Sequence, residues 1–236
     1  MHFISCHDGQ IVTASAVGGS LTPQHDRGFR TGLDVLDYLL PDHSFARGAV
    51  HEILFSGGHP AAKFLALLLA RAAGGVVVWC DRLRTLYPPA VVAAGISVEK
   101  LFLLRPPGQA EQSWAVAECM RCPGVGVTVA PVATLSRVEA LRYHLAAERG
   151  GGVGLLLRPL DRNASVYAAA TRWLVAPAPG LRTVQRWSVQ LIHAHGGRVG
   201  ETVILEHHRE TNTVRAAEQL ADRQAATTPQ PVRASA

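Results

Sequence analysis

The sequence predicts an α/β domain with a mostly parallel sheet, and two features of its 236 residues indicate this. Short apolar segments rich in β-branched residues alternate with helical segments of roughly ten to fifteen residues, and parallel strands need such crossover connections. The segments at 76–80 and 153–157 are continuously apolar, which is typical of strands covered on both faces, and 49–55 reads as a strand by its apolar and β-branched content. We therefore expect one sheet flanked by helices and not two domains of equal size.

The expected elements follow in order from residue 31. Leu33, Leu36 and Leu40 lie on one face of a short helix that Pro41 ends. The strand at 49–55 passes through a tight loop into a helix over 61–73, which Gly74 and Gly75 end. The alternation then continues with a strand at 76–80, a helix at 88–94, a strand at 101–104, a helix at 110–121 and a strand at 125–129.

Two of the helices carry apolar residues on one face. Trp114, Ala117 and Met120 share one side of the helix over 110–121. The next helix is opened by Ser136 and Glu139, which have the spacing of a capping box, and it ends at three glycines before the strand at 153–157. Its apolar face is formed by four residues, namely Leu135, Val138, Leu141 and Leu145.

The C-terminal part has a different pattern. Residues 184–192 and 201–206 alternate apolar with polar side chains and are joined by a glycine-rich turn, which predicts an antiparallel hairpin with one exposed face. From Arg209 the chain is polar, and 224–236 has too little apolar content to pack, so we expect disorder there. Val214, Ala217 and Leu220 could form one weak helical face. We divide the chain into a lead at 1–30, an α/β domain at 31–208 and a tail at 209–236.

Composition excludes some classes of protein. The longest apolar runs are far shorter than the roughly 20 residues of a membrane span, and the N-terminus lacks the pattern of a secretory signal, so we expect a cytoplasmic protein. The net charge of +5 comes almost wholly from arginine, which suits phosphate or carboxylate contacts but also the codon bias of a GC-rich genome. Cys119 and Cys122 have the spacing of half a zinc site, yet no second half follows, so we expect packing thiols and no metal.

The loop after the strand at 49–55 has the spacing of a phosphate-binding loop. Such loops follow the pattern G-x-x-x-x-G-K-[ST] and bind phosphate through backbone N–H groups at a helix N-terminus. The glycines Gly57 and Gly58 begin the loop and Lys63 fits the motif, but Ala62 replaces the second glycine and Phe64 replaces the hydroxyl that binds Mg²⁺. Because that metal neutralises most of the charge in phosphoryl transfer, we expect hydrolysis to be lost.

Two further positions point the same way. A nucleotidase of this kind needs a carboxylate at the end of a central strand, and the strand at 125–129 is followed by Ala130 and Pro131. Asp81 follows another strand, but we favour a turn-capping role for it over catalysis, and we favour a solvated or carbonyl-bonded Lys63 over a phosphate ligand. We therefore expect no enzyme activity and no cofactor, with ATP binding without turnover as the alternative.

These segments resemble a known family. Residues 31–37 and 47–53, followed by the degenerate loop, are similar to the start of the RecA recombinase core. More specifically, the chain resembles the ImuA family of RecA-like accessory proteins in bacterial damage-induced mutagenesis. That resemblance spans roughly residues 31 to 206 and rests on four segments that occur in the same order, 49–53, 118–123, 168–173 and 189–192.

The resemblance implies a RecA-like fold and a non-catalytic role in translesion DNA synthesis within the SOS response. The implied partners are an ImuB-like Y-family protein, an error-prone C-family DNA polymerase and RecA. The family is also related to SulA, the inhibitor of the division GTPase FtsZ, so a division inhibitor is an alternative. The segments after 129 and 157 are short where the recombinase carries its DNA-binding loops, so we expect DNA contact to be indirect or weak.

The expected mode of action is therefore contact with other proteins. Arginines follow the strands of the predicted sheet, where α/β proteins place their functional groups. The candidate interaction residues are Asp81, Arg82, Arg84, Arg158 and Arg162. The competing hypothesis of a residual ATP-binding switch would use Gly57, Lys63 and Asp81.

Overall fold

The computed structural model describes residues 4–7, 10–13, 28–56, 59–160, 168–180 and 183–217, and it describes only the backbone of 4–7, 10–13 and His59. Its helices are α1 (Asp34–Asp37), α2 (His59–Ala73), α3 (Pro88–Ala93), α4 (Gln109–Arg121) and α5 (Arg137–Gly150), with 3₁₀ turns at Pro41–His43 and Val98–Lys100. Two small sheets pair β1 (Ile4–His7) with β2 (Gln10–Thr13) and β3 (Gly28–Phe29) with β4 (Phe45–Ala46).

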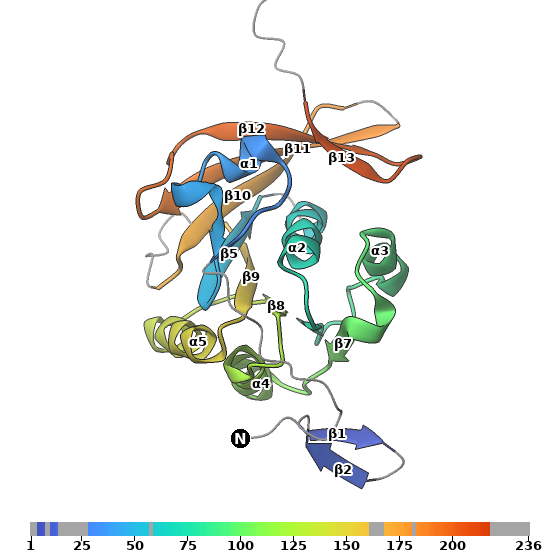
Figure 1. Ribbon diagram of the computed structural model, residues 1–236, viewed down its shortest axis with the longest axis vertical. Helices are drawn as coiled ribbons and strands as arrows, with labels where there is room; N and C mark the ends of the chain where they lie inside the picture. The colour runs from blue at the N-terminus through green and yellow to red at the C-terminus, as the bar shows by residue number, and fades with distance from the viewer. Residues whose placement is uncertain are drawn as a thin grey trace, which may run out of the picture.

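The remaining strands form one nine-stranded sheet (Figure 1). They are β5 (Ala49–Phe55), β6 (Val77–Cys80), β7 (Leu101–Leu104), β8 (Val127–Pro131), β9 (Val153–Pro159), β10 (Thr171–Ala178), β11 (Val184–Ala194), β12 (Thr202–His208) and β13 (Thr213–Ala216). Their order is β13-β12-β11-β10-β5-β9-β8-β6-β7. Neighbours from β10 to β7 are parallel, and β11, β12 and β13 add antiparallel strands beside β10.

Two cores cover the two faces of this sheet. The larger core packs α2 and α3 against one face and includes Leu65, Leu69, Ile53 and Trp79. The other face is covered by α4 and α5 through residues such as Met120 and Tyr143. Every residue of β5 is buried, as expected for a central parallel strand, and this includes the polar residues His51 and Glu52.

A buried polar chain joins the start of β5 to β10 and β4. The indole Nε1–H of Trp173 donates to the hydroxyl of Thr171 at 2.8 Å, and that hydroxyl lies 2.8 Å from His51 Nδ1. His51 Nε2 lies 2.9 Å from the carbonyl oxygen of Ala46, which can only accept, so Nε2 carries the proton and Nδ1 accepts from Thr171. Burial lowers the pKa of His51 from 6.5 to about 4, which keeps the ring neutral in the folded protein.

Helix α5 is turned the opposite way to the sequence prediction. The capping box of Ser136 and Glu139 is present, but the face of α5 that packs inward is built from small residues and Tyr143. Of the predicted apolar face, Leu135 is buried just before the helix, whereas Val138, Leu141 and Leu145 are 68%, 53% and 54% exposed. The face of α5 that carries small residues packs against the core because α5 approaches α4 closely. At the closest point, a Cβ on Gly150 would overlap the carbonyl oxygen of Met120 in α4.

Other local differences have simple causes. Trp114 is 61% exposed, so the predicted apolar side of α4 is wrong at that residue, and Val116 and Ala117 pack inward instead. The predicted strand at 125–129 is β8, which runs two residues later. Val214 lies in β13, which hydrogen-bonds to β12, and not in a helix, so the sheet continues beyond residue 208. The predicted disordered segment 224–236 lies outside the described residues.

The predicted strands, helices and C-terminal hairpin are otherwise present. Cys119 is a buried free thiol and Trp173 and Trp187 are buried, which agrees with packing roles. Among the helices described, none is both long enough and apolar enough to cross a bilayer.

We expect Gly150→Ala to destabilise the protein by about 1–3 kcal/mol, because the added methyl would force α4 and α5 apart. Chemical denaturation measures this loss. Gly124→Ala is the matched control, since a Cβ there meets only the Cys122 sulfur at 3.8 Å, an ordinary contact. Equal stability of the two variants would contradict the close packing of the two helices.

We also expect His51 to make stability depend on pH. Because its pKa is lowered to about 4 by folding, the unfolded chain binds the proton more tightly, and stability is complete above about pH 6.5 and falls as the pH drops toward 4. The loss should approach about 3 kcal/mol. Denaturation between pH 7 and pH 4 measures it, and His51→Gln, which keeps a donor and an acceptor, should have a flatter pH profile. An identical slope in the variant would exclude His51 as the cause.

Candidate functional site

The candidate site is the connection between β5 and α2, where the sequence has the spacing of a phosphate-binding loop. Gly57 and Gly58 lie outside the described residues. Helix α2 begins at His59. Ala62, which replaces the second glycine of the motif, is fully buried in the larger core between α2 and the sheet. This alanine therefore serves as a packing residue.

Lys63 is held by a neighbouring turn. Its ammonium group donates a hydrogen bond of 2.6 Å to the carbonyl oxygen of Thr85. Partial burial lowers the pKa of Lys63, and the nearby carboxylate of Asp81 acts in the opposite direction. The lysine that would contact a phosphate thus bonds to backbone, as the sequence favoured.

Asp81 organises the turn that holds Lys63. Its carboxylate is almost fully buried and accepts hydrogen bonds from the backbone N–H of Thr85 at 2.7 Å and of Leu86 at 3.1 Å. It also accepts one from the Thr85 hydroxyl at 3.2 Å. The carboxylate therefore caps the turn that presents the Thr85 carbonyl to Lys63, and both of its oxygens are engaged in doing so.

Phe64 connects the start of α2 to the antiparallel strands. Its ring stacks on Trp187 of β11, with centroids 5.7 Å apart and an interplanar angle of 27°. It also meets His207 of β12 at 5.8 Å. The position that would supply a hydroxyl ligand to magnesium therefore carries an aromatic ring committed to packing.

The end of β8 carries an amide network in place of a carboxylate. Ala130 is fully buried, and the carbonyl oxygen of Pro131 accepts a hydrogen bond of 2.7 Å from Gln112 Nε2. Gln112 Oε1 in turn accepts one of 3.2 Å from Arg82 Nε. Within the described ranges, no cluster of three His, Cys, Asp or Glu residues is placed to hold a metal ion. The side chains placed here bind backbone and each other.

The candidate interaction residues do not form one surface. Arg82 contacts Gln112, and Arg84 is exposed on the turn after β6 with a backbone φ of 53°. Arg158 lies in β9 and is 5% exposed, so its expected place on an exposed loop is wrong. Arg162 lies outside the described residues.

Arg158 belongs to a buried ion cluster. Its Nη1 donates to Glu52 Oε2 at 2.9 Å, and Arg172 Nε donates to the same oxygen at 3.0 Å. The buried carboxylate of Glu52 requires charged partners, and the two arginines supply them from the neighbouring strands. The cluster therefore links three adjacent strands, β9, β5 and β10.

Sequence reasoning missed this cluster and the role of Gln112. A signal for the cluster was present: a histidine and a glutamate inside the apolar strand at 49–55 must be satisfied by other strands. Gln112 had no such signal, since an amide in a helix is usually solvated.

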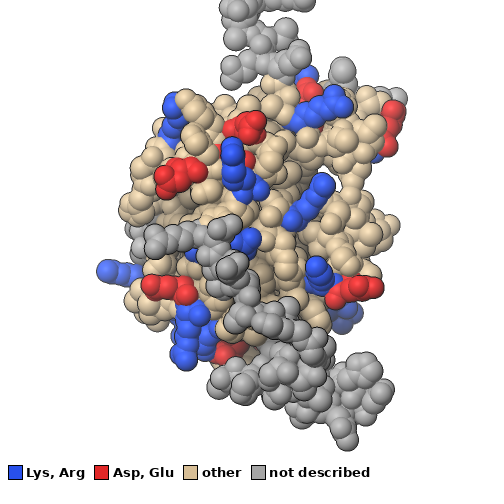
Figure 2. All heavy atoms as spheres, viewed as in Figure 1, with Lys and Arg blue, Asp and Glu red and all other residues tan. Residues whose placement is uncertain are grey.

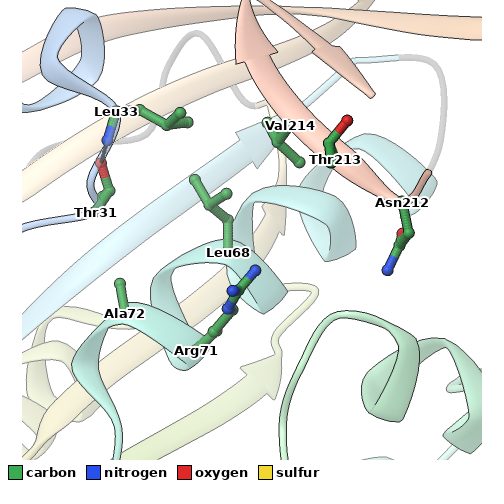
Figure 3. A pocket seen from close by; sticks show the side chains of 8 residues that line it. All are labelled: Thr31, Leu33, Leu68, Arg71, Ala72, Asn212, Thr213 and Val214. Carbon is green, nitrogen blue, oxygen red and sulfur yellow. Dashed lines mark hydrogen bonds between the residues drawn. The ribbon is translucent and has the colours of Figure 1, made fainter. Parts of the chain in front are cut away.

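A separate pocket of about 460 Å³ lies between α2, β13 and the segment before α1. Its lining residues are Thr31, Leu33, Leu68, Arg71, Ala72, Asn212, Thr213 and Val214. Figure 3 shows Arg71 and Leu68 on α2 beneath the residues of β13 and the turn before it. Of the expected site residues that the structure describes, none lines it.

Comparison with known proteins identifies relatives of this chain. The chain is 29% identical to Protein ImuA from two strains of Caulobacter vibrioides over 211 residues, which covers 79% of this chain and 85% of ImuA. It is 27% identical to the cell division inhibitor SulA of Edwardsiella piscicida over 124 residues, covering 51% of this chain and 74% of SulA. No family model matches the chain.

A solved structure of the RadB recombinase superimposes with a TM-score of 0.63 at 15% identity, covering 80% of this chain and 99% of RadB. At that identity the likeness concerns the fold. It confirms the RecA-like fold class, and the sequence alignments confirm the resemblance to ImuA.

The variant Phe64→Ser places a hydroxyl at the magnesium position, and we expect it to lower the free energy of unfolding by about 1–3 kcal/mol. Truncation of a fully buried phenylalanine costs more, about 3–5 kcal/mol. For Phe64→Ser the cause is the lost stacking on Trp187. Urea denaturation measures the change, and Phe64→Leu, which keeps an apolar contact, should lose less. If the serine variant were as stable as the wild type, Phe64 would not be the link between α2 and the antiparallel strands.

Proposed function

We propose that this protein is an accessory protein of bacterial damage-induced mutagenesis that acts by binding other proteins and does not turn over nucleotide. The observation that carries the proposal is the alignment with ImuA over 79% of the chain. The alignment with SulA and the RecA-like fold are consistent with the same group of proteins.

The described residues around the degenerate loop support the non-catalytic part of the proposal. Phosphoryl transfer would need a free lysine, a hydroxyl that binds Mg²⁺ and a carboxylate at the end of a central strand. In this fold Lys63 bonds to Thr85, the hydroxyl position carries Phe64 stacked on Trp187, and Ala130 stands near the end of β8. A strand and helix of this kind without these groups suit a protein that docks onto others. Under this proposal the protein needs no cofactor and works in the cytoplasm.

The partners proposed are those that the resemblance to ImuA implies. They are an ImuB-like Y-family protein, an error-prone C-family polymerase and RecA, with DNA contacted through them. Their joint action would be translesion synthesis under SOS control.

A division inhibitor is the second candidate, because SulA aligns with about half of the chain. Overexpression separates the two: a SulA-like protein would block division and produce filaments in undamaged cells, whereas an accessory protein of mutagenesis would not.

Deletion of the gene should lower the frequency of ultraviolet-induced mutations, and the wild-type gene should restore it. Lys63→Met should restore it equally, because the lysine hydrogen-bonds to the carbonyl oxygen of Thr85 in this fold and has no role in turnover under this proposal. An unchanged mutation frequency in the deletion strain would contradict the proposed function.

Phosphate release from Mg-ATP by the purified protein tests the non-catalytic role separately. We expect no release above background from the wild type or from Lys63→Met. Steady release that requires Lys63 would instead support the ATP-binding switch.

A further inference from the structure

The outer face of α5 is an apolar stripe formed by Val138, Leu141 and Leu145. These side chains are exposed by 68%, 53% and 54%, and their spacing of three and four residues places them on one side of the helix. Single exposed aliphatic residues are ordinary on protein surfaces, but three in a row along one helix are a pattern that partner proteins recognise.

The stripe cannot turn inward in this fold. The inner face of α5 is fixed at its start by the capping box and at its end by the close approach of Gly150 to Met120. Between them, the Tyr143 hydroxyl donates to Ser113 Oγ at 3.2 Å, and Ser113 Oγ donates to Glu139 Oε1 at 3.0 Å. The apolar stripe is therefore a lasting feature of the surface.

Basic residues flank the stripe. Arg137, Arg142 and Arg149 are exposed, and within the described part of the chain they form no hydrogen bond or close ion pair, although the charge of Arg142 helps to lower the pKa of Glu139. Helix α5 has two acidic residues, Glu139 and Glu148. The carboxylate of Glu139 accepts hydrogen bonds from Ser136 and Ser113, so Glu148 is the acidic side chain of α5 that faces solvent. In Figure 2, basic side chains gather at the lower left of the molecule, where α5 lies in Figure 1.

We propose that this stripe docks an amphipathic helix of a partner protein, with apolar residues on Val138, Leu141 and Leu145 and acidic residues opposite the three arginines. Charge complementarity selects this occupant. A second copy of the chain is disfavoured, because a twofold interface places a patch against itself and would oppose the arginines to one another. The inference rests on the proposed function in taking the partner from the mutagenesis machinery.

The test uses the purified full chain and two probes. The first is the ImuB-like protein of the same genome. The second is a synthetic peptide of about 18 residues, about five helical turns, with leucines at helical spacing and flanking glutamates, compared with a twin that carries lysines in their place. Fluorescence anisotropy of labelled probes measures binding.

The double variant Leu141→Glu with Leu145→Glu should weaken binding by about tenfold or more, and Arg142→Glu should weaken it by several-fold. Both leucines are more than half exposed, so the substitutions should leave the melting temperature nearly unchanged. The matched control is Val92→Glu with Val98→Glu, two valines exposed by 50% and 65% outside α5, which should bind as the wild type does.

Each outcome is decisive. Stripe-dependent binding of the ImuB-like protein or of the acidic peptide, with weaker binding of the lysine twin, supports the docking face. If the ImuB-like protein binds regardless of the α5 variants and the acidic peptide does not bind, the docking face is overturned while the proposed function stands. If only the acidic peptide binds and does so through the stripe, the face stands and the proposed partner is wrong. No binding of either probe overturns the docking face.

Discussion

The stacking of Phe64 on Trp187 is the contact on which the arrangement of this protein depends. It joins the first turn of α2, which follows the central strand, to the antiparallel strands at the other end of the sheet. In a nucleotidase that turn must remain open to receive phosphate and metal. Here Phe64 packs on Trp187 and Lys63 hydrogen-bonds to the carbonyl oxygen of Thr85, so these two side chains tie the start of α2 to the antiparallel strands and to the turn after β6.

Strand β5 holds the sheet together in a second way. It carries two buried polar residues, and each is satisfied across a strand boundary: His51 by Thr171 of β10 and by Ala46, and Glu52 by Arg158 of β9 and Arg172 of β10. A buried charge or imidazole without a partner is costly, so these bonds favour one register of β9 and β10 on either side of β5. The polar residues therefore specify strand neighbours that apolar packing would leave less defined.

The exposed apolar face of helix α5 is the feature of the fold that bears most directly on the proposed role. Helix α5 buries small residues and Tyr143 in the core, and it presents large aliphatic residues to solvent as an ordered apolar surface. Such a surface suits a protein that works by assembling others. Together with the engaged side chains of Lys63 and Phe64, it fits the proposed role of a RecA-like protein that acts through contacts with other proteins.

The sequence by itself determined the class of fold, most element positions and the loss of the magnesium hydroxyl, because periodicity, β-branched content and motif spacing are local properties. It also favoured a turn-capping role for Asp81, and for Lys63 it left open whether the ammonium group would be solvated or would bond to a carbonyl. Only the tertiary structure decided which face of α5 is buried. That helix has two apolar stripes, one of Ala140, Tyr143 and Ala147 and one of Val138, Leu141 and Leu145, and the choice between them depends on how closely Gly150 lets α4 approach. The partners of Glu52 and Phe64 were equally out of reach, because they lie more than a hundred residues away along the chain and meet only when the sheet forms.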